Sequence, residues 1–186
     1  APDIPDKYTG LFYPAGQRQL SILYTQGLWI TGMVGDQIRT AACSYGTEFQ
    51  PGQIIDGQAA DPQDEKYKIY KYNKGDVIDQ AAIDQGAPTE VMGEQMLYCV
   101  YNDLRTHSTF DTQPIGVEVQ QTVWGYAAKG ALGNTVFIKF RIINKGVADL
   151  DSAYLSAFFD PDLGDSNDDA TGCDSTEGFV YVYNGD

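Results

Sequence analysis

The sequence predicts an all-β fold, an antiparallel β-sandwich of jelly-roll or immunoglobulin type, with long loops and at most one short helix. Apolar and polar residues alternate with a period of two in many segments, whereas the 3.6-residue period of an amphipathic helix is nearly absent. About nine such segments are separated by turn signals, as in a β-sandwich. A hydrophobic share of 42% over 186 residues is enough to build one core.

Three strands are expected in the N-terminal quarter of the chain. The alternating pattern covers three consecutive segments, 20–26, 27–34 and 37–45. Gly35 and Asp36 predict a turn between the last two, because glycine adopts positive φ without steric cost. The Gly-, Pro- and Asp-rich stretch 51–65 then predicts a long polar surface loop.

The remaining strands are expected between residue 66 and the C-terminus. Tyr and Ile alternate with Lys over 66–73, which is typical of a half-exposed strand. Only 77–88 has helical character, and Gly86 and Pro88 would end a short helix there. Five further segments have strand patterns: 96–102, 116–127, 134–144, 151–159 and 178–184.

We expect residues 1–186 to form a single β-sandwich domain, because no internal repeat or low-complexity segment interrupts the strands. The sequence stops directly after a strand-like segment. An edge strand at that point would expose unpaired backbone N–H and C=O groups. We therefore expect either a fragment of a longer chain or an edge that another subunit covers.

The charge of the chain restricts its partners. The net charge is −14 and the isoelectric point is near 4.2, so nucleic acids and anionic lipid surfaces are repelled. Divalent cations, basic proteins and neutral glycans remain as candidate partners. No apolar run reaches the roughly 20 residues that a membrane-spanning helix needs.

Three cysteines, Cys43, Cys99 and Cys173, allow at most one internal disulfide. Their spacing fits no metal-ligand pattern. Two interpretations stay open: buried or unpaired thiols, and a Cys99–Cys173 disulfide that would tie the acidic segment to a strand end.

The segment 160–174, DPDLGDSNDDATGCD, is the strongest candidate site. Carboxylate oxygens are preferred ligands of Ca²⁺, which takes six to eight of them. So many carboxylates in one loop repel one another unless a cation neutralises them. The sequence therefore predicts a calcium site, with a solvated acidic loop as the alternative. The candidate ligands are Asp160, Asp162, Asp165, Asn167, Asp168, Asp169 and Asp174.

The acidic segment does not match a helix–loop–helix calcium hand. The match covers the alternating oxygen ligands Asp165, Asn167 and Asp169 and then fails. Ala170 stands where such a hand requires glycine, and Thr176 stands where it requires the bidentate glutamate. The flanking segments also have strand patterns. A loop site within a β-sandwich is the better prediction.

No catalytic constellation is evident, so we do not expect an enzyme. His107 is the only histidine, and a lone loop histidine is expected at the surface. No G-x-S-x-G turn and no phosphate-binding glycine loop occur. A glycosidase pair of carboxylates could arise by chance among 26 acidic residues and remains an unspecific third hypothesis.

The chain is aromatic-rich, and these side chains have two possible uses. Aromatic faces can stack on the C–H bonds of glycans, which requires an exposed line of them on one sheet face. At alternating strand positions they more often form the core. Trp29 and Trp124 are predicted to be core residues.

An ordered series of motifs resembles a known group of proteins. It runs through GLWITGMV, RTAACSYGTEFQPG, GEQMLYCVYND, PIGVEVQQTVWGYA, ALGNTVFIKFRIINKG and LDSAYLSAFFDPDLGDSNDDATGCD to YNGD. The series is similar to the N-terminal region of large secreted surface proteins of the Bacteroidetes and Ignavibacteria, many of which carry a sorting domain for type IX secretion. The resemblance covers the chain from about residue 11 to its end.

The resemblance implies location more than activity. It implies export to the cell surface or medium, with a β-rich module near the mature N-terminus. Ser152 and Ser175 lie in the triplets DSA and DST, which resemble a short O-glycosylation signal of such bacteria.

Together these features predict an extracellular, calcium-stabilised structural or adhesive module. Self-association into a surface filament or sheath, or binding to other surface proteins, is the expected mode of action. The alternative is a carbohydrate-binding module of a larger secreted polysaccharide hydrolase.

Overall fold

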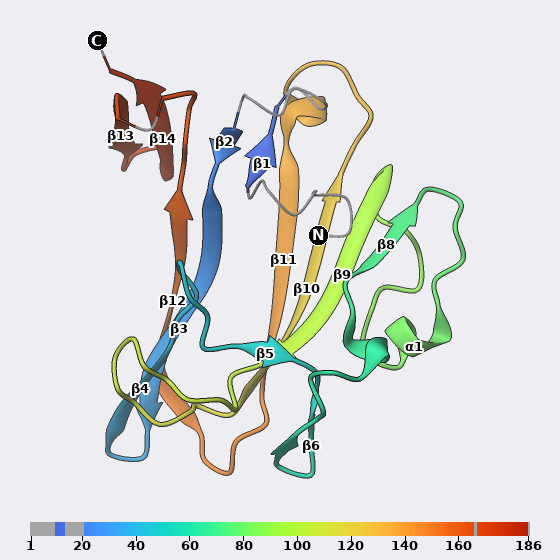
Figure 1. Cartoon of the computed structure of the whole chain (residues 1–186), viewed down its shortest axis with the longest axis vertical. Helices are drawn as coiled ribbons and strands as arrows, with labels where there is room; N and C mark the ends of the chain where they lie inside the picture. The colour runs from blue at the N-terminus through green and yellow to red at the C-terminus, as the bar shows by residue number, and fades with distance from the viewer. Residues whose placement is uncertain (1–9, 14–20, 166, 186) are drawn as a thin grey trace. The chain divides into compact units, whose positions relative to one another are not determined.

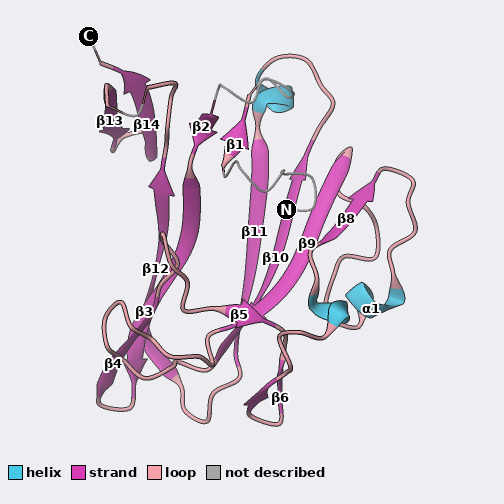
Figure 2. Ribbon diagram, viewed as in Figure 1, coloured by secondary structure: helices cyan, strands magenta, loops and turns pink. Residues whose placement is uncertain are grey.

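The computed structural model describes residues 10–13, 21–165 and 167–185. The chain is mostly β, with antiparallel pairing and one short α-helix, α1 (Gln80–Ile83), which confirms the predicted all-β, sandwich-like fold (Figures 1 and 2). No helix in the described ranges has the length and apolar character needed to cross a membrane.

Fourteen strands are present in the described ranges. They are β1 (Leu11–Phe12), β2 (Ser21–Leu23), β3 (Thr25–Val34), β4 (Gln37–Ala41), β5 (Gln50–Pro51), β6 (Ile54–Ile55), β7 (Gln58–Ala59), β8 (Tyr70–Asn73), β9 (Gln95–Asn102), β10 (Val117–Gly125), β11 (Val136–Asn144), β12 (Leu150–Asp160), β13 (Asp169–Asp174) and β14 (Phe179–Asn184). Two short 3₁₀ helices, η1 (Glu65–Tyr67) and η2 (Ala131–Asn134), complete the elements.

The chain divides into two compact units. The larger unit comprises Ile30–Ala42 and Thr47–Tyr154, and the smaller one comprises the described residues of Ala1–Trp29, Cys43–Gly46 and Leu155–Asp186. Strands β3 and β12 each run from one unit into the other. The single-domain prediction therefore stays a prediction.

The larger unit is built on a five-stranded antiparallel sheet of order β11-β10-β9-β5, with β8 also paired to β9 (Figure 2). One face of β9 and β8 carries buried residues, because alternate side chains of a strand share a face. Helix α1 packs there through Ala82, which has no exposed surface. The resulting core contains Tyr70, Tyr72, Ile78, Ala82, Ala87, Met96 and Tyr98.

The helix and the first hairpin follow their local signals. Helix α1 begins after Asp79, and Gly86 adopts a φ of 98° just beyond its end. β3 and β4 pair in register from Ile30–Ala41 to Val34–Gln37, and Gly35 between them has a φ of 60°. The short helix and the Gly35 turn are thus confirmed.

The predicted loop 51–65 is partly wrong, because it contains the small hairpin β6–β7. Asp56 and Gly57 form its turn with φ values of 50° and 74°, the backbone that an Asp-Gly turn favours. Ile54 anchors the hairpin, since its side chain is buried and its N–H donates to Glu118 Oε2 at 3.0 Å. The short elements β1, β5 and η2 lie where no element is predicted, and η1 occupies the start of the predicted strand 66–73, which is therefore shorter than expected.

The smaller unit contains the β13–β14 hairpin. Its strands pair in register from Asp169–Asn184 to Asp174–Phe179. The acidic segment was expected to be a loop throughout, and the structure corrects this: its second half is β13. Asp174 closes the hairpin turn by accepting the N–H groups of Thr176 at 2.8 Å and Glu177 at 3.0 Å.

Candidate functional site

Three carboxylates of the acidic segment come close together in the smaller unit. Asp160 ends β12, Asp162 lies in the connection and Asp169 begins β13. Burial raises the pKa of the Asp162 carboxyl, and the negative charges of Asp160 and Asp169 raise it further. In the ionised state the Asp162 carboxylate is therefore repelled by the other two.

Asp169 has one oxygen without a donor. Its Oδ2 accepts the backbone N–H of Leu163 at 3.0 Å, while its Oδ1 is buried and has no hydrogen-bond partner among the described residues. A buried acceptor with no partner is rare in folded proteins and usually indicates a bound water or ion. Asn184 lies directly opposite Asp169 on β14.

Three of the other predicted ligands, Asp165, Asn167 and Asp174, make local hydrogen bonds of their own. Asp165 accepts the backbone N–H of Asn167 at 3.0 Å and its side-chain amide at 2.8 Å, which lowers the pKa of Asp165. Asp168 contributes its backbone carbonyl to the Gly185 N–H. Asp174 lies at the opposite end of β13 from Asp169, about 16 Å away at the usual rise of a strand. In the parts of the chain that the structure describes, no three His, Cys, Asp or Glu side chains are grouped so as to hold a metal ion.

Aromatic residues adjoin the acidic group. A hydrogen bond to the Asp160 carboxylate raises the pKa of the Tyr45 phenol, with smaller contributions from burial and from the charges of Asp160 and Asp162. The Tyr45 ring packs edge-on against Phe158 at 5.6 Å, and Phe158 stacks on Trp29 at 6.2 Å. Trp29 is half-buried, as Trp124 is, where it stacks on Phe137.

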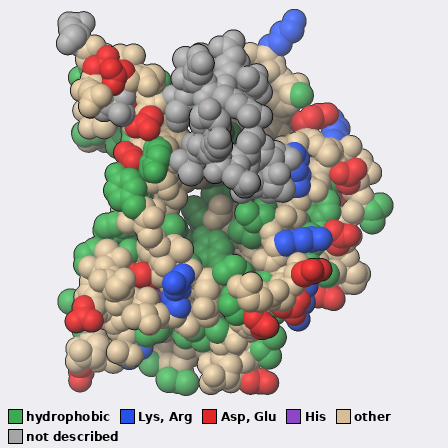
Figure 3. Space-filling model, in the orientation of Figure 1, with side chains coloured by type: hydrophobic (Ala, Val, Ile, Leu, Met, Phe, Trp, Pro, Cys, Tyr) green, Lys and Arg blue, Asp and Glu red, His purple; other side chains and the backbone are tan. Residues whose placement is uncertain are grey.

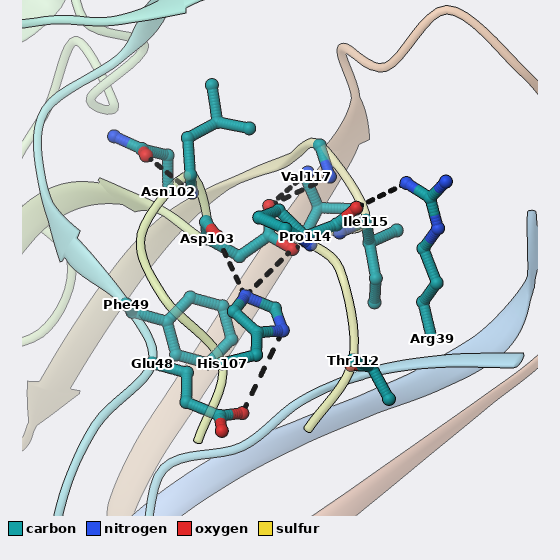
Figure 4. Close-up of polar contacts among 12 residues, drawn as sticks. Arg39, Glu48, Phe49, Asn102, Asp103, His107, Thr112, Pro114, Ile115 and Val117 are labelled. Atoms are coloured by element: carbon teal, nitrogen blue, oxygen red, sulfur yellow. Dashed lines mark hydrogen bonds and ion pairs between the residues drawn. The ribbon is translucent and has the colours of Figure 1, made fainter. Parts of the chain in front are cut away.

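A second polar cluster lies inside the larger unit, where Glu48, Asp103 and His107 are buried (Figure 4). Asp103 follows β9 directly and has no exposed surface. Its Oδ1 accepts the N–H groups of Gly116 at 2.9 Å and Val117 at 2.7 Å, and its Oδ2 accepts that of Ile115 at 2.6 Å. Burial raises the pKa of the Asp103 carboxyl, and these three donors oppose the rise. Asp103 thus fixes the start of β10.

His107 lies between the two carboxylates (Figure 4). Its Nδ1 is 2.6 Å from the carbonyl oxygen of Thr40 and its Nε2 is 2.8 Å from that of Asp103. Each ring nitrogen thus lies within hydrogen-bonding distance of a backbone carbonyl oxygen, which can only accept. A carboxylate oxygen of Asp103 lies 3.6 Å from Nε2, and one of Glu48 lies 4.0 Å from Nδ1.

Glu48 joins two loops to this cluster. Its Oε2 accepts the N–H of Ala42 at 2.7 Å and its Oε1 accepts that of Thr109 at 2.6 Å. Burial alone would raise the pKa of Glu48, but these N–H donors and the charge of His107 outweigh it and hold the pKa below its ordinary value. Every group in the cluster is therefore occupied in holding backbone segments together.

The prediction of a surface histidine is wrong, because the side chain of His107 has no exposed surface. The long connection between β9 and β10 could have indicated that His107 is buried. A long connection that packs beside a sheet needs polar side chains as hydrogen-bond partners for its backbone. Asn102 and Asp103, at the end of β9, are also completely buried, with partners in the larger unit.

Two clefts open in the larger unit. One of about 360 Å³ has mostly apolar walls with the cationic residues Arg39 and Lys145. The other, of about 650 Å³, is lined by residues 57–59, 104–107 and 111–114. His107 contributes to the second, but both of its ring nitrogens are occupied, so it provides no free general base.

The three cysteines are free thiols, and because Cys99 and Cys173 belong to different units, the candidate Cys99–Cys173 disulfide stays a prediction. Cys99 lies on β9, where burial raises the pKa of its thiol to about 11, whereas Cys173 is exposed on β13. The candidate glycosylation positions Ser152, on β12, and Ser175, in the hairpin turn, are both exposed.

A row of exposed aromatic residues was not predicted at any particular place. Phe179, Tyr181 and Tyr183 alternate along β14 and are about half exposed. Figure 3 shows hydrophobic side chains beside acidic ones in this part of the surface.

Comparison of the chain with protein-family models, curated proteins and solved structures finds no significant match. The proposals below therefore rest on the site geometry and on the sequence.

Proposed function

We propose that this chain is an extracellular, calcium-stabilised β-sandwich module with a structural or adhesive role at the cell surface and without catalytic activity. One observation carries the calcium part of the proposal. The carboxylate of Asp162 is repelled by those of Asp160 and Asp169, and a buried oxygen of Asp169 has no donor among the described residues.

A hard cation would relieve both features. Ca²⁺ binds carboxylate, amide and carbonyl oxygens and tolerates irregular geometry, so backbone carbonyls and water can complete its shell. Asn184 is available at the same end of the hairpin. A cation there would tie β12 to the β13–β14 hairpin, which is a structural role.

The exposed apolar residues of β12 support a role in contact with other molecules. Leu155 is 61% exposed and Phe159 50%, and these two side chains share one face because they stand four residues apart on the strand. Exposed apolar side chains on one face are a feature of interaction sites. A second copy in a surface filament or sheath, or another surface protein, fits this strand.

Thermal unfolding with and without calcium tests the leading function. The protein is passed over a chelating resin, and its melting temperature is followed as CaCl₂ is added. At a calcium concentration of 100 times the Kd we expect a rise of about 5–10 °C. Mg²⁺ at the same concentration is the matched ion control. An unchanged melting temperature would exclude a stabilising calcium ion.

Carbohydrate binding is the second candidate function. The specific observation in its favour is the row of half-exposed aromatic side chains on β14. A line of exposed rings on one sheet face is the feature that distinguishes a glycan-binding surface from a core.

A further inference from the structure

The β14 face has the form of a stacking platform. Phe179, Tyr181 and Tyr183 occupy alternate positions, so their side chains share one face of the hairpin. Their exposed fractions are 52%, 46% and 51%. The ring centroids are 5.9 Å apart from Phe179 to Tyr181 and 6.0 Å apart from Tyr181 to Tyr183. The rings thus form an evenly spaced line.

The neighbouring strand leaves this line open. Gly172 is the partner of Tyr181 and Ala170 is the partner of Tyr183, so β13 places no large side chain beside the two tyrosines. The Tyr181 ring lies over Gly172, where an added Cβ atom would be 2.4 Å from Cζ of the ring. Because the hairpin backbone supports the central ring, the platform is largely pre-organised, which lowers the entropic cost of binding.

The charge around the platform restricts its occupant. Asp174 is paired with Phe179, and Glu177 lies in the turn just before it. The whole chain carries a net charge of −14. Anionic polymers and a second copy of this acidic hairpin are repelled at such a surface, whereas a neutral ligand is not. The carboxylates and the phenol groups can hydrogen-bond to hydroxyl groups.

We propose that the β14 face binds a neutral, extended glycan chain, with successive pyranose rings stacking on Phe179, Tyr181 and Tyr183. The apolar C–H face of an equatorially substituted pyranose is complementary to the negative face of an aromatic ring. The even spacing of the three rings is comparable to the repeat of one sugar unit in an extended β-linked chain. This inference rests on the second candidate function and names its ligand class and its site.

Affinity electrophoresis in native gels tests the inference. The gels contain hydroxyethyl cellulose, xyloglucan or galactomannan as neutral probes and polygalacturonate as the anionic probe. We expect retardation by at least one neutral polymer and none by polygalacturonate. Tyr181→Ala should weaken the retardation at least about tenfold, and Tyr183→Ala should weaken it less because that ring lies at one end of the row. Tyr126→Ala, which removes an exposed tyrosine from the segment after β10, is the matched control and should leave it unchanged.

Circular dichroism of each variant verifies that the fold is retained. Three results would overturn the inference: no retardation by any neutral probe, equal retardation of Tyr181→Ala and the parent, or a dimer of the parent that Tyr181→Ala converts to a monomer in sedimentation velocity. The last result would assign the face to a second copy. The calcium proposal is tested by the melting temperature and the glycan proposal by retardation in gels. Failure of one proposal can therefore be distinguished from failure of the other.

Discussion

The Nδ1 atom of His107 lies 2.6 Å from the backbone carbonyl oxygen of Thr40, although 67 residues separate them in the sequence. The same carbonyl oxygen accepts the Thr112 hydroxyl at 3.0 Å. The connection between β9 and β10 is therefore held against β4 by polar groups inside the larger unit.

Replacing His107 should strongly destabilise the larger unit. His107→Ala removes the buried ring that contacts the carbonyl oxygens of Thr40 and Asp103. We expect a loss of about 3–5 kcal/mol in the free energy of unfolding, measured by urea denaturation, because a cavity forms and buried polar groups lose their partner. Ser108→Ala, at the exposed neighbouring position, is the control and should change the value by less than about 0.5 kcal/mol. A loss of similar size in both variants would contradict a structural role of the buried ring.

Protonation of Glu48 should lower the free energy of unfolding at acid pH. Its folded pKa lies below the ordinary value of 4.5, so its contribution is fully present above about pH 4.5 and is lost as the pH falls through the folded value. Glu48→Gln cannot titrate. The difference in unfolding free energy between the parent and Glu48→Gln, measured by urea denaturation from pH 6 to pH 3, should shrink toward low pH. A difference that is constant with pH would refute this.

Asp169→Asn should have opposite effects with and without calcium. It removes one of the two charges that repel the Asp162 carboxylate, so the variant should melt at a higher temperature than the parent in chelator. It also removes a proposed ligand, so the rise in melting temperature on adding CaCl₂ should fall to a small fraction of the parent value. Asp174→Asn, at the other end of β13, should keep the full calcium-dependent rise. Equal calcium responses in both variants would argue against a site at Asp169.

The two strand cysteines should differ in reactivity. Cys173 is exposed, whereas burial raises the pKa of Cys99 to about 11, and the thiolate is the reactive form. With Ellman's reagent at pH 8, we expect Cys173 to react in the native protein and Cys99 to react only after unfolding. Cys173→Ser should remove the fast phase, and Cys99→Ser should leave it. A native protein in which no thiol reacts until a reductant is added would indicate a disulfide instead.

Replacing Gly57 by alanine should lower the free energy of unfolding. Its φ of 74° is unfavourable for other residues, yet a Cβ atom there would meet nothing within 4 Å, so Gly57→Ala isolates backbone strain. We expect a loss of about 1 kcal/mol in urea denaturation. Gly46→Ala is the matched control, because Gly46 also has open space around it but no positive φ, and it should be neutral or slightly stabilising.

Part of the candidate site could be predicted from the sequence, because charge density is local information. The crowding of acids in 160–174 is visible in the sequence, and three of them do come together. The separation of Asp169 from Asp174 could not be predicted. The two residues stand at opposite ends of β13, and this strand forms only when it pairs with β14. The small residues Ala170 and Gly172 gave that strand no apolar pattern of its own.

By itself, the sequence determined the antiparallel β class, the one short helix and the turn at Gly35, because each depends on neighbours along the chain. Only the tertiary structure decided that His107 is buried and that the β14 rings are exposed. The physical reason is that burial and hydrogen bonding of these groups depend on partners far away in the sequence. The carbonyl of Thr40 and the backbone of Gly172 lie beside His107 and Tyr181 only after the strands have paired.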